Sequence, residues 1–258
     1  MLSSRDNKLA GGKQHIFLLC SMHQVEDMPV KNKKEWNSLL SKARKGDPEA
    51  QWEAGYYYEE GLITNRGTVI IEPQPKRALH WYTLSAQQNL ASSQIALGNL
   101  LSTGDGIKRD IEGAIYWTKQ AIKQGSSSAA HNLGTIYRDL NKPTLSFNWY
   151  LRAVEMGDLD SLFQVGLCHL FGYGTKTDYS GAHNCFEQIL KGKAVNICER
   201  TIENASYWSG IIDLLGIGDS KRSVKKARRL LEDANKDGDH EQANEILNLI
   251  GKNKYLVA

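Results

Sequence analysis

Small and aromatic residues recur along the chain with the period of an α-helix. One helical face, made by positions i, i+3, i+4 and i+7, collects Ala114, Trp117, Thr118 and Ala121. The phrase "AIYWTKQA" around them has relatives in "ALHWYTLSA" and "SFNWYLRA". The pattern therefore predicts helices that each bury one face of small and aromatic residues.

The spacing of these phrases indicates an internal repeat. Trp81, Trp117 and Trp149 are separated by 36 and then 32 residues. A series of glycines runs through other related phrases, such as "SQIALGNLLSTG", at Gly55, Gly98, Gly134, Gly166 and Gly210. Each unit thus contains an A helix, with the central glycine, and a B helix, with the alanine and aromatic residues. Because Gly and Ala let two helix backbones approach closely, we expect them to face each other, with the tryptophan covering the seam.

Turn and cap residues between the helices support this division. Gly104 is placed to end an A helix in the left-handed conformation, and Gly106 permits the reversal that follows. Asp110 is placed to cap the next B helix. The equivalent starts of other B helices hold Asp178, Ser223 and two prolines at the first helical position, Pro75 and Pro143.

The repeat predicts five two-helix units and one closing helix. Their limits are 37–89, 90–125, 126–157, 158–192 and 193–238, and a capping helix follows at about 239–250. The first unit has a long inter-helix loop, "LITNRGTVIIEPQP", the third lacks paired glycines, and the fifth has extra residues before Gly210. We expect residues 36–250 to form one solenoid and 251–258 a C-terminal tail.

Residues 1–35 do not follow the repeat. Their apolar run, "IFLLC", is short for a secretion signal and no clean cleavage site follows it. We therefore expect a disordered tail and a cytoplasmic protein. The alternative is a periplasmic or secreted protein in which residues 1–25 act as a signal.

The quoted motifs resemble the Sel1-like repeat. That family shows A-x-x-x-(L/V)-G-x-x-Y, then G-x-G, then D-x-x-x-A-x-x-W-Y, and the best match is "ALGNLLSTGDGIKRDIEGAIYWTKQAIKQG". The resemblance covers roughly residues 46–245. It implies an all-α fold, a right-handed α-solenoid related to tetratricopeptide repeats, and a role in binding other proteins. It also suggests, as a narrower possibility, a bacterial immunity or effector-regulating protein.

Composition excludes several other classes. The chain of 258 residues is 41% hydrophobic and 24% charged, which is the composition of an ordinary globular protein. Its net charge of +3 is too small to indicate nucleic-acid binding. No apolar run has the length of a membrane span. The basic run "KRSVKKARRL" is best interpreted as the solvated face of a helix, although an acidic partner or anionic lipid is an alternative.

The cysteines and histidines are the candidate metal ligands and nucleophiles of the chain. Cys168, His169, His183, Cys185 and Cys198 lie within about one unit, but their spacing matches no zinc template. His169 and Cys185 stand at positions that hold aromatic residues in other units, so a core role is favoured. No nucleophile elbow or phosphate loop is present, and we expect no catalytic residue, metal or cofactor. A metal-dependent or hydrolase-type enzyme is the alternative.

A binding surface is expected where the A helices line the inside of the solenoid. Relative to each central glycine, positions −3, +1 and +4 should face this groove, and aromatic residues and arginine there would be anchors for a protein or peptide. In the last two units these positions are so apolar that a partner or the C-terminal "NKYLVA" should cover them. The candidate partner-binding residues are Trp52, Tyr56, Glu59, Asn99, His131, Arg138, Phe163 and Tyr207.

Overall fold

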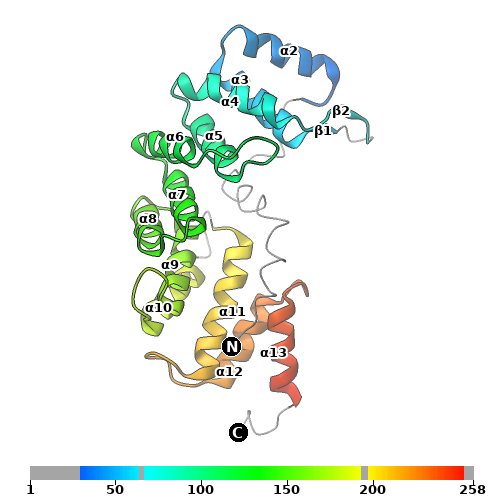
Figure 1. The fold of residues 1–258 in the computed structure, drawn as a ribbon. Helices are drawn as coiled ribbons and strands as arrows, with labels where there is room; N and C mark the ends of the chain where they lie inside the picture. The colour runs from blue at the N-terminus through cyan, green and yellow to red at the C-terminus, as the bar shows by residue number, and fades with distance from the viewer. Residues whose placement is uncertain (1–29, 64–66, 193–196, 253–258) are drawn as a thin grey trace. The chain divides into compact units, whose positions relative to one another are not determined.

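The computed structural model describes residues 30–63, 67–192 and 197–252 (Figure 1). Apart from one short hairpin, the regular elements of these residues are α-helices that follow one another along the chain. They fall into two compact units, an N-terminal unit within residues 29–177 and a C-terminal unit within 178–258. The predicted all-α solenoid is confirmed.

The N-terminal unit contains three complete pairs of an A and a B helix. Each of α3, α5 and α7 contacts the helix before it and the helix after it, α9 contacts α8, and α5 also contacts α7. In chain order the elements are α2 (Lys33–Arg44), α3 (Pro48–Glu60), β1 (Leu62–Ile63), β2 (Val69–Ile71), α4 (Pro75–Gln87), α5 (Ala91–Thr103), α6 (Ile111–Lys123), α7 (Ser127–Asp139), α8 (Pro143–Glu155) and α9 (Leu159–Phe171).

The C-terminal unit contains the fifth predicted pair, flanked by a helix on each side. Its elements are α10 (Tyr179–Lys191), α11 (Glu199–Leu215), α12 (Val224–Ala234) and α13 (Glu241–Lys252). Contacts again run between consecutive helices. None of the helices in the described ranges combines the length and the apolar character of a membrane-spanning segment.

Helix ends form as the turn and cap residues predict. Gly104 follows α5 in the left-handed conformation, with φ of 75°, and the side chain of Asp110 accepts a hydrogen bond from the Gly113 N–H at the start of α6. The third unit has a shorter connection, from Asp139 to Pro143, in which Asn141 has φ of 53°. Asn tolerates this conformation better than most non-glycine residues, so it can make the turn without the paired glycines.

Two of the central glycines pack against a B-helix tyrosine that leaves no room for a Cβ atom. The sequence pattern did not point to this tyrosine. A Cβ atom on Gly134 would lie 2.7 Å from the ring of Tyr150, and one on Gly55 would lie 2.5 Å from the ring of Tyr82. Both tyrosines are only 1% exposed. The preceding tryptophans, Trp81 and Trp149, are only half-buried. In these two pairs the residue after each tryptophan therefore meets the central glycine, and the tryptophan itself stays half-buried.

Two features depart from the predicted limits. The first predicted unit, starting at residue 37, begins inside α2, which is a separate helix with Trp36, Leu39 and Leu40 buried. The long loop of that unit forms an antiparallel hairpin of β1 and β2. The run Val69–Ile71 is β-branched and cannot extend either flanking helix, since Gly61 and Pro73 interrupt the chain on both sides.

Candidate functional site

The candidate site is the row of side chains on successive A helices of the N-terminal unit. Six predicted residues lie there and remain partly exposed. We call them the A-helix surface: Trp52, Tyr56 and Glu59 on α3, Asn99 on α5, and His131 and Arg138 on α7.

The part of this surface on α3 is aromatic and acidic. The rings of Trp52 and Tyr56, one helical turn apart, have centroids 6.4 Å apart. Glu59 accepts a hydrogen bond of 2.7 Å from the hydroxyl of the buried Tyr82. Burial raises the pKa of Tyr56, and the nearby Glu60 and Glu59 add to the effect. Because both aromatic rings are half-buried, they offer preformed apolar contact area with little side-chain freedom to lose.

A hydrogen-bonded amide pair connects α5 with α7. Asn132 donates from Nδ2 to Oδ1 of Asn99 over 3.0 Å. The Nδ2 atom of Asn99 is buried and has no hydrogen-bond partner among the described residues. The sequence analysis missed Asn132, which stands two residues before its central glycine. Only the contact between neighbouring A helices shows that this position faces the preceding unit.

His131 is bound to the start of the next A helix. Its Nδ1 atom lies 2.7 Å from Oγ of Ser161 and 3.4 Å from Oδ2 of Asp158. Burial alone would raise the pKa of Asp158, but hydrogen bonds from His131 and Ser161 outweigh it and lower that pKa. As a result Asp158 precedes α9 without making the side-chain cap that Asp47 makes for α3. His131 therefore ties two units together as well as lining the surface.

This Ser–His–Asp group does not have the geometry of a catalytic triad. In a triad the serine and the carboxylate contact opposite nitrogens of the imidazole, whereas Ser161 and Asp158 both approach Nδ1 of His131. Ser161 is also 0% exposed and its hydroxyl donates to Asp158. The arrangement suits a structural hydrogen-bond network and leaves no accessible nucleophile.

Arg138 closes the surface on α7. Its guanidinium donates to Oδ1 of the adjacent Asp139 over 3.2 Å, and its side chain is 37% exposed. The hydroxyl of Tyr173, in the loop after α9, donates to the backbone carbonyl of Arg138 and holds that loop against this end of α7. A cation thus stands on α7 and an anion, Glu59, on α3.

Two of the predicted partner-binding residues pack against other parts of the chain. Phe163 is 6% exposed, so it belongs to the core of the N-terminal unit and not to an open surface. Tyr207 stacks on His240 with ring centroids 4.8 Å apart. Together with Ile211 and Leu214 it packs against a cluster that includes Ala243 and Ile250 of α13. The apolar positions of α11 are therefore covered by α13, and "NKYLVA" lies outside the described residues.

The cysteine and histidine group does not form a metal site in the described chain. Cys168 and Cys185 are buried, and burial raises the pKa of each thiol to about 11. The His169 ring makes an edge contact with Phe147, at 5.4 Å between centroids. These environments are those of core residues.

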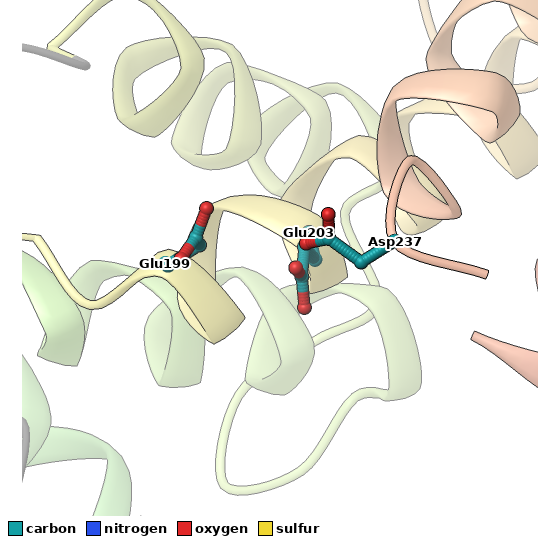
Figure 2. Close-up of side chains that lie close together, drawn as sticks. All are labelled: Glu199, Glu203 and Asp237. Atoms are coloured by element: carbon teal, nitrogen blue, oxygen red, sulfur yellow. The ribbon is translucent and has the colours of Figure 1, made fainter. Parts of the chain in front are cut away.

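A different acidic cluster lies in the C-terminal unit. Figure 2 shows Glu199 and Glu203 on the first turns of α11 and Asp237 on the loop before α13. Lys236 pairs with Glu199, and Arg200 lies 3.8 Å from Glu203. Two cations of the chain therefore contact two of the three carboxylates, and Arg200 also lies 3.7 Å from Asp239.

Helix pairs with a central glycine, a left-handed turn and a B-helix cap define the chain as a short-repeat α-solenoid. The Sel1 repeat family matches residues 48–90, 91–126, 127–158 and 159–190, which is more than half of the chain. The chain belongs to the Sel1 repeat family.

Similar proteins agree on the fold. The crystal structure of c5321, a protective antigen of uropathogenic Escherichia coli, is 26% identical, with a TM-score of 0.68, over 84% of this chain and 44% of that one. A Sel1 repeat protein from Oxalobacter formigenes is 22% identical, with a TM-score of 0.64, over 83% and 80%. Chitin synthase regulatory factor 3 of Schizosaccharomyces pombe is 30% identical over 118 residues, 43% of this chain and 12% of its own length. The chain thus matches only a small part of that curated relative.

Proposed function

We propose that this chain is a non-catalytic interaction scaffold and that the A-helix surface binds a polypeptide segment of a partner protein. Proteins of the Sel1 repeat family are typically protein-interaction scaffolds. The observation that carries the proposal is the row of partly exposed aromatic, amide and charged side chains on α3, α5 and α7. These helices are consecutive A helices, which in a solenoid of this kind are expected to line its inner side.

The chemistry of the row suits a peptide backbone flanked by side chains. Trp52 and Tyr56 supply apolar anchors of the kind that dominate binding energy. Arg138, whose side chain is 37% exposed, supplies a cation, and the partly exposed Glu59 supplies an anion for charged side chains of the bound segment.

The test compares what wild-type and variant proteins capture. Trp52→Ala and Arg138→Ala remove two exposed groups of the surface, and Tyr116→Ala is the control because it removes a 55% exposed aromatic side chain from a B helix. Quantitative mass spectrometry of co-purified proteins should show one protein lost from both surface variants and retained by the control. All three variants should keep the wild-type circular dichroism spectrum. A partner retained by Trp52→Ala and Arg138→Ala contradicts the proposal.

A narrower version makes the partner a toxin or effector, with this chain as its immunity or regulating protein. The test is the gene next to the one that encodes this chain. A toxin gene in that place supports this version, and a housekeeping operon weighs against it.

A further inference from the structure

We propose that the cleft between α2 and α3 docks a helix of a partner protein that carries a lysine or arginine. The cleft is separate from the A-helix surface, so this proposal stands or falls independently of the one above. It rests on the register of α2, on the lining of the cleft and on the charges that the chain leaves unpaired there.

By register, α2 is a B helix without an A helix before it in the described chain. The turn after α2 contains Gly46, with φ of 96°, as the turn after α6 contains Gly125, with φ of 89°. An A helix follows both turns. In every later pair of the N-terminal unit, the B helix also packs against a preceding A helix. Among the described helices, none before α2 covers the corresponding face.

The residues on this face differ from those of the later B helices. Glu35 and Lys42 stand eleven and four residues before Gly46, where α6 has Ala114 and Ala121. Both alanines are 0% exposed, because α5 covers them. Glu35 and Lys42 are exposed. On the later B helices this face is apolar and covered by an A helix. On α2 the equivalent face is charged and exposed.

The cleft at this place is a cavity of about 300 Å³. Its floor is apolar and its rim is acidic. The floor comprises Val30, Leu39 and Ala50, and the rim comprises Glu35, Asp47, Glu49, Glu53, Ser38 and Lys42.

Two of the rim carboxylates have no partner in the described chain. Glu35 accepts a hydrogen bond from the backbone of Lys31, and Asp47 caps α3 by accepting from Ala50. Glu49 and Glu53 make no hydrogen bond or ion pair with any described residue. They are the charges that a ligand would neutralise.

The electrostatics of the cleft favour an incoming cation. Burial raises the pKa of Glu53; Lys42 opposes the increase, whereas Glu49 and Asp47 add to it. A lysine or arginine fits this lining, since its aliphatic stem can lie over the apolar floor while its charged head meets carboxylates.

The repeat also fixes where the basic residue must stand on the docked helix. Glu53 lies two residues before Gly55, as Asn132 lies two residues before Gly134. Asn132 bonds Asn99, which lies one residue after the central glycine of the preceding A helix. The cation should therefore follow directly after the small central residue of the partner helix.

A second copy of the chain is a poor occupant. Its free helix of A type, α13, has Asn248 as its eighth residue, where the other A helices of 13 residues have the central glycine. A side chain there prevents the close approach to a B helix that glycine permits. The exposed Glu241 and Glu245 of α13 would also bring like charge to the acidic rim.

The experiment titrates the full-length chain with two synthetic helices and follows backbone amide NMR signals. Both are acetylated and amidated copies of Ala91–Thr103, one with Asn99→Arg and the other with Asn99→Glu. The arginine peptide should shift the amide signals of Leu39, Glu49 and Glu53 and bind about ten-fold tighter than the glutamate peptide. The variant Glu49→Gln/Glu53→Gln should abolish that preference, and it should keep its fold because both side chains are unpaired.

Other outcomes overturn the proposal. Equal affinity of the two peptides would contradict the claim that charge selects the ligand. Signal shifts confined to α5–α9 would show that the peptide does not bind in the cleft. Shifts at α2 and α3 on dilution, without peptide, identify a second copy as the occupant. Changes in the amide signals of residues 1–28 on Glu49→Gln/Glu53→Gln identify the chain's own N-terminal segment instead.

Discussion

Replacing the central glycine of α7 with alanine should destabilise the protein when Tyr150 faces it and stabilise the protein when that residue is alanine. In Gly134→Ala the new Cβ atom lies 2.7 Å from two ring carbons of Tyr150, whereas ordinary contacts are 3.4–4 Å. The ring and the helix must then separate by at least about 0.7 Å, and such overpacking costs about 1–3 kcal/mol. Tyr150 is 1% exposed and its hydroxyl lies 3.1 Å from Thr135 Oγ1, so the ring cannot move away freely.

The magnitude follows from setting this cost against helix propensity. Alanine stabilises a helix interior by about 1 kcal/mol relative to glycine. Gly134→Ala should therefore lower the free energy of unfolding by up to about 2 kcal/mol. In a Tyr150→Ala background the clash is gone, and the same change should raise that free energy by about 1 kcal/mol.

Urea unfolding followed by tryptophan fluorescence measures both effects. Gly251→Ala is the control, because a Cβ atom there meets nothing within 4 Å, and it should not destabilise. A stabilising effect of Gly134→Ala in the wild-type background would refute the claim that glycine is kept for close helix approach.

Three further predictions follow from burial and charge. Trp149→Ala should destabilise less than Tyr150→Ala, for which about 3–5 kcal/mol is expected, and equal losses in urea unfolding would contradict the assigned register. Because its pKa is lowered in the folded state, ionised Asp158 stabilises the fold above pH ~4, and this contribution is lost as the pH falls through its folded pKa. Asp158→Asn should therefore cost about 2 kcal/mol at pH 7 and flatten the stability profile below pH ~4, whereas an unchanged profile would show that the network is unimportant. Cys168 and Cys185 should resist iodoacetamide at pH 8 until the protein unfolds, because burial raises their pKa to about 11. Rapid labelling of the folded protein, detected by peptide mass spectrometry, would instead support the enzyme alternative.

The repeat was predictable from the sequence because its signals are local. Gly104 and Asp110 define a helix end and a helix start through backbone conformation and capping alone. The identity of the fully buried aromatic position was not predictable in the same way. Trp149 and Tyr150 are adjacent and both aromatic, and only the angle at which α8 packs on α7 decides which one meets Gly134.

The candidate site could be predicted less well for the same reason. Positions on one face of an A helix follow from the helical period, but coverage by distant elements does not. Phe163 has the same register as His131 yet is buried, and Tyr207 is covered by α13. The open face of α2 was also missed, since its register becomes visible only when Gly46 is aligned with the turns after the later B helices.

The most direct test of the account measures the affinity of the purified partner for three proteins by isothermal titration calorimetry. These are the wild-type chain, the double variant Trp52→Ala/Arg138→Ala and the B-helix control Tyr116→Ala. We expect the double variant to bind at least about thirty-fold more weakly and the control to bind within about two-fold of the wild type. Unchanged binding by the double variant, or a loss seen only with Tyr116→Ala, would contradict the assignment of partner binding to the A helices.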